Sequence, residues 1–309
     1  MITDIAYLEM LVKDFDECLH VYTKELGMTE IQNTQSVQNE KGEWISIASA
    51  EQGNREAIIQ VGNSYLVLHE DANAITQVLP NGDIISANEV QGTVGHYSFY
   101  AQGNDHAYSH MKSFYTSYRY GRTKEGPSVQ PMNHSYLQRS LLEFADPNGY
   151  TVQISEIIDP RLEKQKRRRE KTDIANMSQG AIVKGFDHFS MRCSDLKIGK
   201  GFYSETLGLE IIHHEQSDAS EEYVFSAGLC DLELSSSSLN PLDKPLYGPR
   251  IVSSYGLWCD DLESVINNLS FEPKRLERDL ALGVRVKYIT LNSGDGFLIQ
   301  ILEQIQSDS

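Results

Sequence analysis

A long internal repeat is the feature of this sequence that most restricts its fold. Residues 7–31, YLEMLVKDFDECLHVYTKELGMTEI, align without a gap with residues 188–212, HFSMRCSDLKIGKGFYSETLGLEII. At one constant offset of 181 residues, the matched positions are Asp14 with Asp195, Tyr22 with Tyr203, Gly27 with Gly208, and Ile31 with Ile212. Each copy predicts a strand, an aspartate at the N-cap of an amphipathic helix, a glycine that ends the helix, and a second strand.

Two weaker copies extend the repeat over the rest of the chain. Residues 94–115 and 253–269 also have the pattern of a strand followed by a helix. Further strand-like runs follow the four helices, at residues 64–70, 150–156, 230–236 and 296–303. The sequence therefore predicts four βαβββ units, near residues 1–72, 92–158, 185–238 and 250–305, in two domains at 1–158 and 185–309.

The charged segment 159–184 joins the two predicted domains. Six of the eight residues 164–171 are Lys or Arg, a pattern that would suit a nucleic-acid or acidic partner. The whole chain carries a net charge of −17, however, and a general nucleic-acid binder needs cationic side chains to neutralise phosphates. We therefore interpret the segment as a solvated, helical linker, and we expect no nucleic-acid partner.

Composition points to a folded protein that stays away from membranes. Hydrophobic residues make up 40% of the 309 residues and charged residues 23%, a globular balance. No apolar run approaches the roughly 18–20 residues that cross a bilayer, and the first ten residues lack the features of a signal peptide. The cysteines stand singly among apolar residues and are expected to be reduced, buried thiols: Cys18, Cys193, Cys230 and Cys259. These features predict a cytoplasmic protein with no membrane partner.

The residues of the repeat resemble a known family. The segments DHFSMRCSDLKIGKGFYSETLGLEII (187–212) and DPNGYTVQISE (146–156) are similar to the vicinal oxygen chelate superfamily. That superfamily includes glyoxalase I, fosfomycin-resistance and bleomycin-binding proteins, and the extradiol ring-cleaving dioxygenases, which the four units in one chain particularly resemble. The resemblance covers nearly the whole chain. It implies an α+β fold in which four βαβββ modules form two cup-shaped mixed sheets.

The resemblance also implies where metal ligands would lie. Each unit of this family can offer one ligand at the start of its first strand and one in the middle of its last strand. The first-strand positions of units one to four hold Tyr7, His96, His188 and Ser254. The last-strand positions hold Val67, Gln153, Glu233 and Gln300. The implied site is a divalent metal ion bound by His96, His188 and Glu233, with Gln153 as a neutral neighbour or a further ligand.

The pairing of the units decides whether these residues can meet. If units three and four pair, the site holds His188, Glu233 and Gln300, with Ser254 where a second histidine is expected. If unit two pairs with three, and one with four, both histidines and the carboxylate gather in one place. Two imidazoles and one carboxylate form the facial triad that holds non-haem Fe(II) with open coordination positions. We predict the second arrangement, for which the linker leaves room.

Each candidate ligand also has a purely structural interpretation. A lone histidine on a strand is more often hydrogen-bonded than metal-bound. Here histidines occur at two matching repeat positions, which favours a ligand role for His188. For His96 the ligand role and the structural role are equally favoured. Glu233 is a carboxylate in a core strand, which is costly unless the charge is paired or metal-bound. An exposed sheet face would explain Glu233 without a metal.

Softer candidates surround these positions. Arg192 shares the face of His188 and could meet an anionic substrate group, although an ion pair is an equal alternative. The other expected pocket residues are Ser190, Ser98 and Tyr100, and the candidates for acid–base catalysis are His134, His213 and Tyr223.

Three functions fit these residues. The favoured one is an Fe(II) extradiol-type dioxygenase that cleaves the ring of a catechol-like small molecule. The second is a glyoxalase-like isomerase or lyase that uses Ni²⁺, Zn²⁺ or Mn²⁺ to stabilise an enediolate. The third is a metal-free protein that binds a small ligand in the cup, as bleomycin-binding relatives do. The sequence leaves the oligomeric state open, with a homo-oligomer as one option.

Overall fold

The computed structural model describes most of the strands and three of the predicted helices. The described residues are 1–34, 55–71, 93–101, 128–133, 138–147, 151–157, 182–193, 195–218, 220–237, 252–280, 284–293 and 297–305. Most of the predicted linker, His134 and the segment expected to form the helix of unit two lie outside these residues.

The first and last units share one sheet, which we call the 1/4 sheet. Its strand order is β14-β15-β16-β13-β1-β4-β3-β2. Its strands are β1 (Ile2–Val12), β2 (Thr29–Thr34), β3 (Glu56–Val61), β4 (Ser64–Glu70), β13 (Val252–Cys259), β14 (Leu276–Asp279), β15 (Arg285–Asn292) and β16 (Leu298–Gln304). The first strands of the two units, β1 and β13, pair antiparallel at the centre, so the units join edge to edge.

The two middle units share the other sheet, which we call the 2/3 sheet. Its strand order is β10-β11-β12-β9-β5-β8-β7-β6. Its strands are β5 (Thr93–Ala101), β6 (Ser128–Asn133), β7 (Gln138–Ala145), β8 (Thr151–Ile157), β9 (Val183–Arg192), β10 (Glu210–Gln216), β11 (Ser220–Ala227) and β12 (Cys230–Ser237). Here β5 and β9 form the central antiparallel pair, which places unit two beside unit three.

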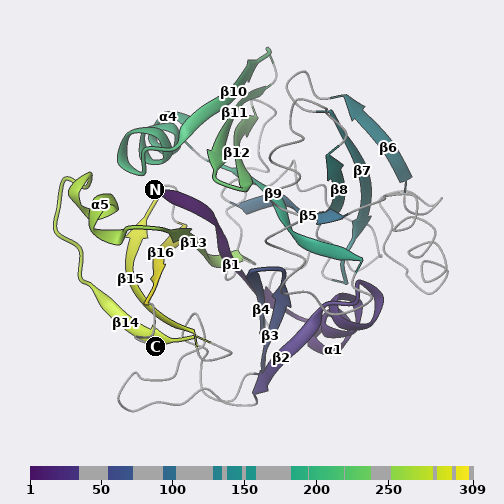
Figure 1. Ribbon diagram of the computed structural model, residues 1–309. Coiled ribbons are helices and arrows are strands. Elements are labelled where there is room, and N and C mark those ends of the chain that lie inside the picture. Colours follow the sequence, from purple (N-terminus) through teal and green to yellow (C-terminus); the bar gives the residue numbers. More distant parts are fainter. Residues whose placement is uncertain are drawn as a thin grey trace.

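Both sheets are mixed and curled into open cups, which confirms the predicted fold class (Figure 1). In each of the four units the first strand lies parallel to the last strand. The other neighbouring strands of both sheets pair antiparallel. Within the described residues, units one, three and four each show a strand, a helix and three further strands in that order.

The helices begin and end where the repeat predicts. They are α1 (Phe15–His20) with the π-helical segment η1 (Val21–Glu25), α4 (Leu196–Gly201) with η4 (Phe202–Thr206), and α5 (Leu262–Asn267). The side chains of Asp14, Asp195 and Asp261 cap them by accepting a backbone N–H three residues later. Gly27 and Gly208 follow with φ angles of 70° and 69°, the left-handed conformation that glycine adopts without steric cost.

A β-bulge interrupts the first strand of every unit at the same place. In each central ladder the pairing skips one residue just before the predicted ligand position. At these four places the skipped residues are Ala6, Gly95, Asp187 and Ser253. A bulged residue breaks the strict alternation of side chains between the two faces of a sheet. The repeat of this irregularity in four units supports the alignment that the sequence predicts.

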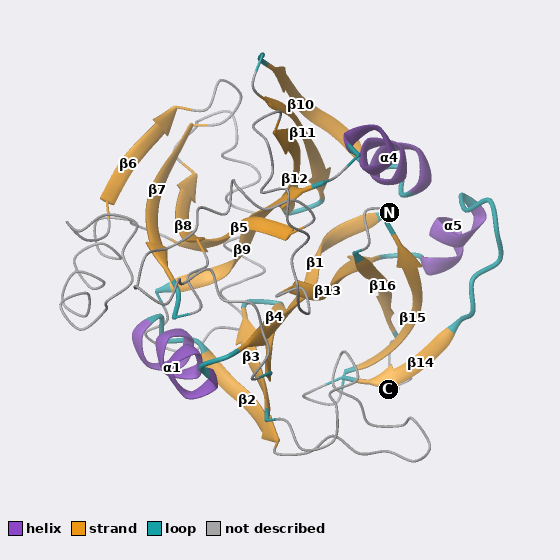
Figure 2. Cartoon of the chain, turned by 180° about the vertical axis from the view of Figure 1, so that it is seen from behind, coloured by secondary structure: helices purple, strands orange, loops and turns teal. Residues whose placement is uncertain are grey.

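The larger cluster of buried hydrophobic residues lies against the convex faces of the two sheets and includes the helices, and a smaller one that contains Tyr7 and Val67 lies in the cup of the 1/4 sheet. Two hydroxyl contacts join the sheets through repeat-related tyrosines. Tyr22 of η1 meets Tyr97 of β5, and Asp146 accepts hydrogen bonds from both at 3.0 and 3.2 Å. Tyr203 of η4 similarly meets Tyr255 of β13. Each contact thus ties a helix of one sheet to a central strand of the other, and Figure 2 shows α1 and α4 on opposite sides of the molecule.

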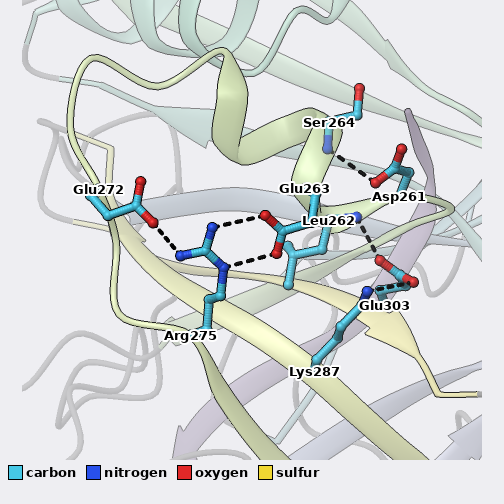
Figure 3. Close-up of polar contacts among 8 residues, drawn as sticks. All are labelled: Asp261, Leu262, Glu263, Ser264, Glu272, Arg275, Lys287 and Glu303. Atoms are coloured by element: carbon cyan, nitrogen blue, oxygen red, sulfur yellow. Dashed lines mark hydrogen bonds and ion pairs between the residues drawn. The ribbon is translucent and has the colours of Figure 1, made fainter.

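Polar contacts anchor α5 to the 1/4 sheet (Figure 3). Glu303 of β16 accepts hydrogen bonds from the backbone N–H of Leu262, 2.6 Å away, and from Lys287 Nζ, 2.9 Å away. Arg275 bridges Glu263 and Glu272 on the exposed side of the helix. The contact with Glu303 satisfies one of the unpaired N–H groups at the start of α5.

All four cysteines are buried and free, as the sequence predicts. No helix among the described residues has the length and apolar character needed to span a membrane.

Candidate metal centre

Three neighbouring strands of the 2/3 sheet bring the predicted ligands to one face. His96 of β5 pairs with Ser190 of β9, and Glu233 of β12 pairs with that same serine from the other side. His188 lies two residues before Ser190, and alternate residues of a strand face the same side. The two imidazoles and the carboxylate therefore project together from the concave face.

The distances between their donor atoms fit a single ion. The Nε2 atoms of His96 and His188 are 3.1 Å apart, and they lie 3.3 and 3.8 Å from the two carboxylate oxygens of Glu233. One donor atom from each residue lies within 4.8 Å of the others. Ligands about 2.1 Å from one metal ion, at right angles to each other, are about 3 Å apart. The three donors are thus close to the spacing of a coordination shell.

Burial differs among the three residues. The side chains of His188 and Glu233 are 3% and 6% exposed, whereas that of His96 is 23% exposed. The rings of the histidines meet edge to face, with centroids 5.1 Å apart. The centre therefore has a deep, protein-covered side at His188 and a more open side at His96.

Gln153 supplies a fourth donor beside the triad. It lies on β8, where it pairs with Ser98 of β5, and its Oε1 is 3.1 Å from Nε2 of His188. Gln153 is also buried. All four residues predicted at the ligand positions of units two and three thus lie together, and their oxygen and imidazole donors suit a divalent cation.

Solved structures with the same fold include named enzymes. A provisionally named dioxygenase from Bacillus subtilis superimposes with a TM-score of 0.63 at 15% sequence identity, over 99% of this chain and 86% of that chain. Two glyoxalase I variants from Zea mays give TM-scores of 0.57 and 0.55 at 12% identity, each over 97% of this chain and over 92% and 93% of theirs. No protein-family model matches the sequence, and the comparison with curated proteins gives no match.

The chain has the vicinal oxygen chelate fold. The TM-scores of 0.63 and 0.57 establish this architecture, whereas identities of only 15% and 12% leave the chemistry to be argued from the residues.

The vicinal oxygen chelate cup places the predicted pocket residues on the face of the triad. Ser98 and Ser190 are buried directly opposite His188 and His96 in the central ladder. Tyr100 lies two residues beyond Ser98 and is fully buried. Arg192 lies two residues beyond Ser190, and burial lowers its pKa while the charges of Glu222 and Glu233 oppose that shift.

The predicted proton-transfer residues separate into different places. His213 of β10 pairs with Val224, which in turn pairs with Glu233, so His213 belongs to the concave face of the cup. Tyr223 is on the other face of β11, where it stacks on His214 and donates a hydrogen bond to Glu221 at 2.9 Å. The structure therefore does not bring Tyr223 to the triad. His134 lies outside the described residues.

One carboxylate of the cup was missed by the sequence reasoning. Glu222 of β11 pairs with Ser235, two residues beyond Glu233 on the same face. Burial raises the pKa of Glu222 to about 7, and the negative charge of Glu233 adds to the shift. The sequence shows an acidic residue here, but the sheet face to which Glu222 points depends on the register of β11 against β12, which the repeat does not predict.

Proposed function

We propose that this protein is a metal-dependent enzyme of vicinal oxygen chelate type, with Fe(II) as the metal and a catechol-like ring as the substrate. The observation that carries the proposal is the meeting of two imidazoles and one carboxylate, from three strands of two units, at the spacing of one coordination shell. A 2-His-1-carboxylate set is the donor set of non-haem Fe(II) oxygenases. The B. subtilis structure named as a dioxygenase agrees with this choice at the level of the fold.

The chain's own residues have separate tasks in this proposal. When bound, Fe(II) supplies open coordination positions where two adjacent substrate oxygens and O₂ can meet. His188 and Glu233 form the buried wall of the centre, and the more exposed His96 marks the side from which a substrate enters. Arg192 offers a positive charge to an ionised substrate oxygen, since it shares the concave face. Among the three proton-transfer candidates, His213 is the one with a described place on that face.

Oxygen uptake by anaerobically prepared, Fe(II)-loaded protein tests this reaction. With catechol as the probe, we expect one O₂ to be consumed per ring opened, with both oxygen atoms in the product. His188→Ala should abolish the uptake, whereas Ser254→Ala, at the equivalent first-strand position of unit four, should retain it. Fe(II) binding without oxygen uptake for any catechol probe would contradict the ring-cleaving proposal and leave the metal site intact.

A second function, a glyoxalase-like isomerase or lyase, is favoured by Gln153. Its carbonyl oxygen makes the donor set four residues rather than three, which leaves fewer open positions for O₂. In this case Ni²⁺- or Zn²⁺-loaded protein would turn over an α-hydroxycarbonyl probe under nitrogen, because the metal would act as a Lewis acid toward an enediolate. Purified protein that takes up no metal would contradict both functions and favour a small-ligand-binding protein.

A further inference from the structure

Asp187 occupies the β-bulge immediately before His188. In the ladder between β5 and β9, Ser98 pairs with His188 and the next pair is Phe99 with Phe186, so Asp187 is skipped. Neighbouring residues of a regular strand point to opposite faces, which would direct Asp187 away from the cup. The bulge removes this restriction and lets the two neighbouring side chains meet.

The contact between the two residues is short and buried. Oδ2 of Asp187 lies 2.8 Å from Nδ1 of His188, and the carboxylate is fully buried. An ionised carboxylate can only accept a hydrogen bond, so the proton of a neutral His188 ring sits on Nδ1. The lone pair is then on Nε2, the ring atom that faces His96, Gln153 and Glu233.

The carboxylate distinguishes unit three from its repeats. The residues at the same bulge in the other units are Ala6, Gly95 and Ser253. Gly95 precedes His96, so the second histidine has no side chain before it that could accept a hydrogen bond from its ring. The bulge is therefore a property of the fold, whereas its acidic residue belongs to the unit with the deeply buried histidine.

We propose that Asp187 is a positioning residue, which holds His188 as the Nδ1–H tautomer and so directs the Nε2 lone pair toward the metal. The expected effect on metal affinity rests on the proposed function. The expected tautomer of His188 does not. Carboxylates that accept a hydrogen bond from a ligating histidine fix its tautomer and orientation, and their loss typically lowers metal affinity about 10–100-fold.

Two variants and one matched control separate this role from general stability. Asp187→Ala removes the acceptor, and Asp187→Asn keeps its size with a weaker, neutral acceptor. The control is Glu56→Gln, because Glu56 is also fully buried and its Oε2 lies 3.3 Å from Nδ1 of His69 in the other sheet. Nitrogen-15 NMR of the metal-free proteins reports the tautomer of His188, and Fe(II) titration under anaerobic conditions reports the affinity.

We expect the Nδ1–H tautomer of His188 in the wild type and in Glu56→Gln, and a shift toward Nε2–H in Asp187→Ala. Fe(II) affinity should fall about 10–100-fold in Asp187→Ala, less in Asp187→Asn, and remain unchanged in Glu56→Gln. An unchanged tautomer in both Asp187 variants would overturn the assignment. So would a shifted tautomer with wild-type affinity. If the tautomer shifts but the wild-type protein itself binds no metal, the proposed function fails and the positioning role of Asp187 stands.

Discussion

The two cups of this molecule have the same architecture and different chemistry. The cup of the 2/3 sheet places His188, His96, Glu233 and Gln153 at the four ligand positions. In the 1/4 sheet the same register positions hold Tyr7, Ser254, Val67 and Gln300. The Tyr7 ring packs over Gly256, where a Cβ atom would overlap it. The Tyr7 ring thus occupies in the 1/4 cup the position that the imidazole of His188 occupies in the 2/3 cup.

The 1/4 cup is nevertheless rich in buried charge. His69 Nε2 lies 2.7 Å from Glu9 Oε1, and its Nδ1 lies 3.3 Å from Glu56 Oε2. Arg278 donates a hydrogen bond to Gln300 at 2.5 Å and stacks on the ring of Tyr288. Two carboxylates are therefore accompanied by two groups of the protein that can carry positive charge.

The 2/3 cup has a different set of charged groups among its described residues. Glu222 and Glu233 share the concave face with Arg192, and Asp187 lies against His188. The imidazoles of His96 and His188 also face these carboxylates, and the raised pKa of Glu222 lets that residue be neutral near pH 7, so net charge alone does not distinguish the two cups. The difference lies in how the donors are arranged. In the 2/3 cup two imidazoles and a carboxylate converge within 4.8 Å of one another, whereas in the 1/4 cup His69 lies between two carboxylates.

The largest expected effect comes from removing the candidate ligands of the 2/3 cup and changing the equivalent positions of the 1/4 cup. Glu233→Ala and His96→Ala should each lower metal affinity by more than the roughly 10–100-fold that an outer partner contributes. Ser254→Ala, which changes the position equivalent to His96, should leave the affinity unchanged. Metal analysis of the purified proteins measures this. Full occupancy in His96→Ala together with loss in Gln300→Ala would place the ion in the 1/4 cup instead.

Removing a charged residue from the 1/4 cup should lower the stability of the protein and leave metal binding unchanged. His69→Ala removes the cationic partner of two buried carboxylates, which we expect to cost about 3–5 kcal/mol of unfolding free energy. Urea unfolding measures the loss, and His214→Ala is the matched control because that exposed histidine pairs with a surface carboxylate. A change in metal affinity in His69→Ala would show that the two cups are not independent.

The same histidine predicts how stability depends on pH. Burial alone would lower the pKa of His69, but the hydrogen bond to Glu9 and the charges of Glu9 and Glu56 outweigh it and raise the pKa above 6.5. A raised folded-state pKa gives a stabilisation that is complete below the unfolded pKa and is lost as the pH rises through the folded value. Wild-type stability should therefore decline above neutral pH more steeply than that of His69→Gln, as urea unfolding at several pH values would show.

The repeat explains why so much of the fold could be predicted. A constant offset of 181 residues relates the first strand, the helix cap and the first-strand ligand position of unit one to those of unit three, and the bulges before Tyr7 and His188 have the same offset. Because His96 and His188 occupy equivalent positions in central strands, their meeting follows once unit two pairs with unit three.

What the sequence could not predict depends on strand register and on bulges. The face of Glu222 follows from the alignment of β11 with β12, which no local pattern encodes. The contact of Asp187 with His188 contradicts simple alternation and requires the bulge. The charged network around His69 could not be predicted from the repeat, because unit one has no metal-binding residue at its ligand positions and His69 lies at neither of them.

The finest comparison between the cups concerns their two glutamines. Gln153 Oε1 lies 3.1 Å from a candidate ligand atom, whereas Gln300 Oε1 accepts a hydrogen bond from Arg278. A neutral carbonyl donor contributes less to a divalent ion than imidazole or carboxylate, so Gln153→Ala should lower metal affinity by about 10-fold, and Gln300→Ala not at all. Competition with a metal-binding dye resolves a change of this size. If Gln153→Ala binds the ion as tightly as the wild type, the centre is a three-residue triad, and the position of Gln153 is open to O₂ or substrate.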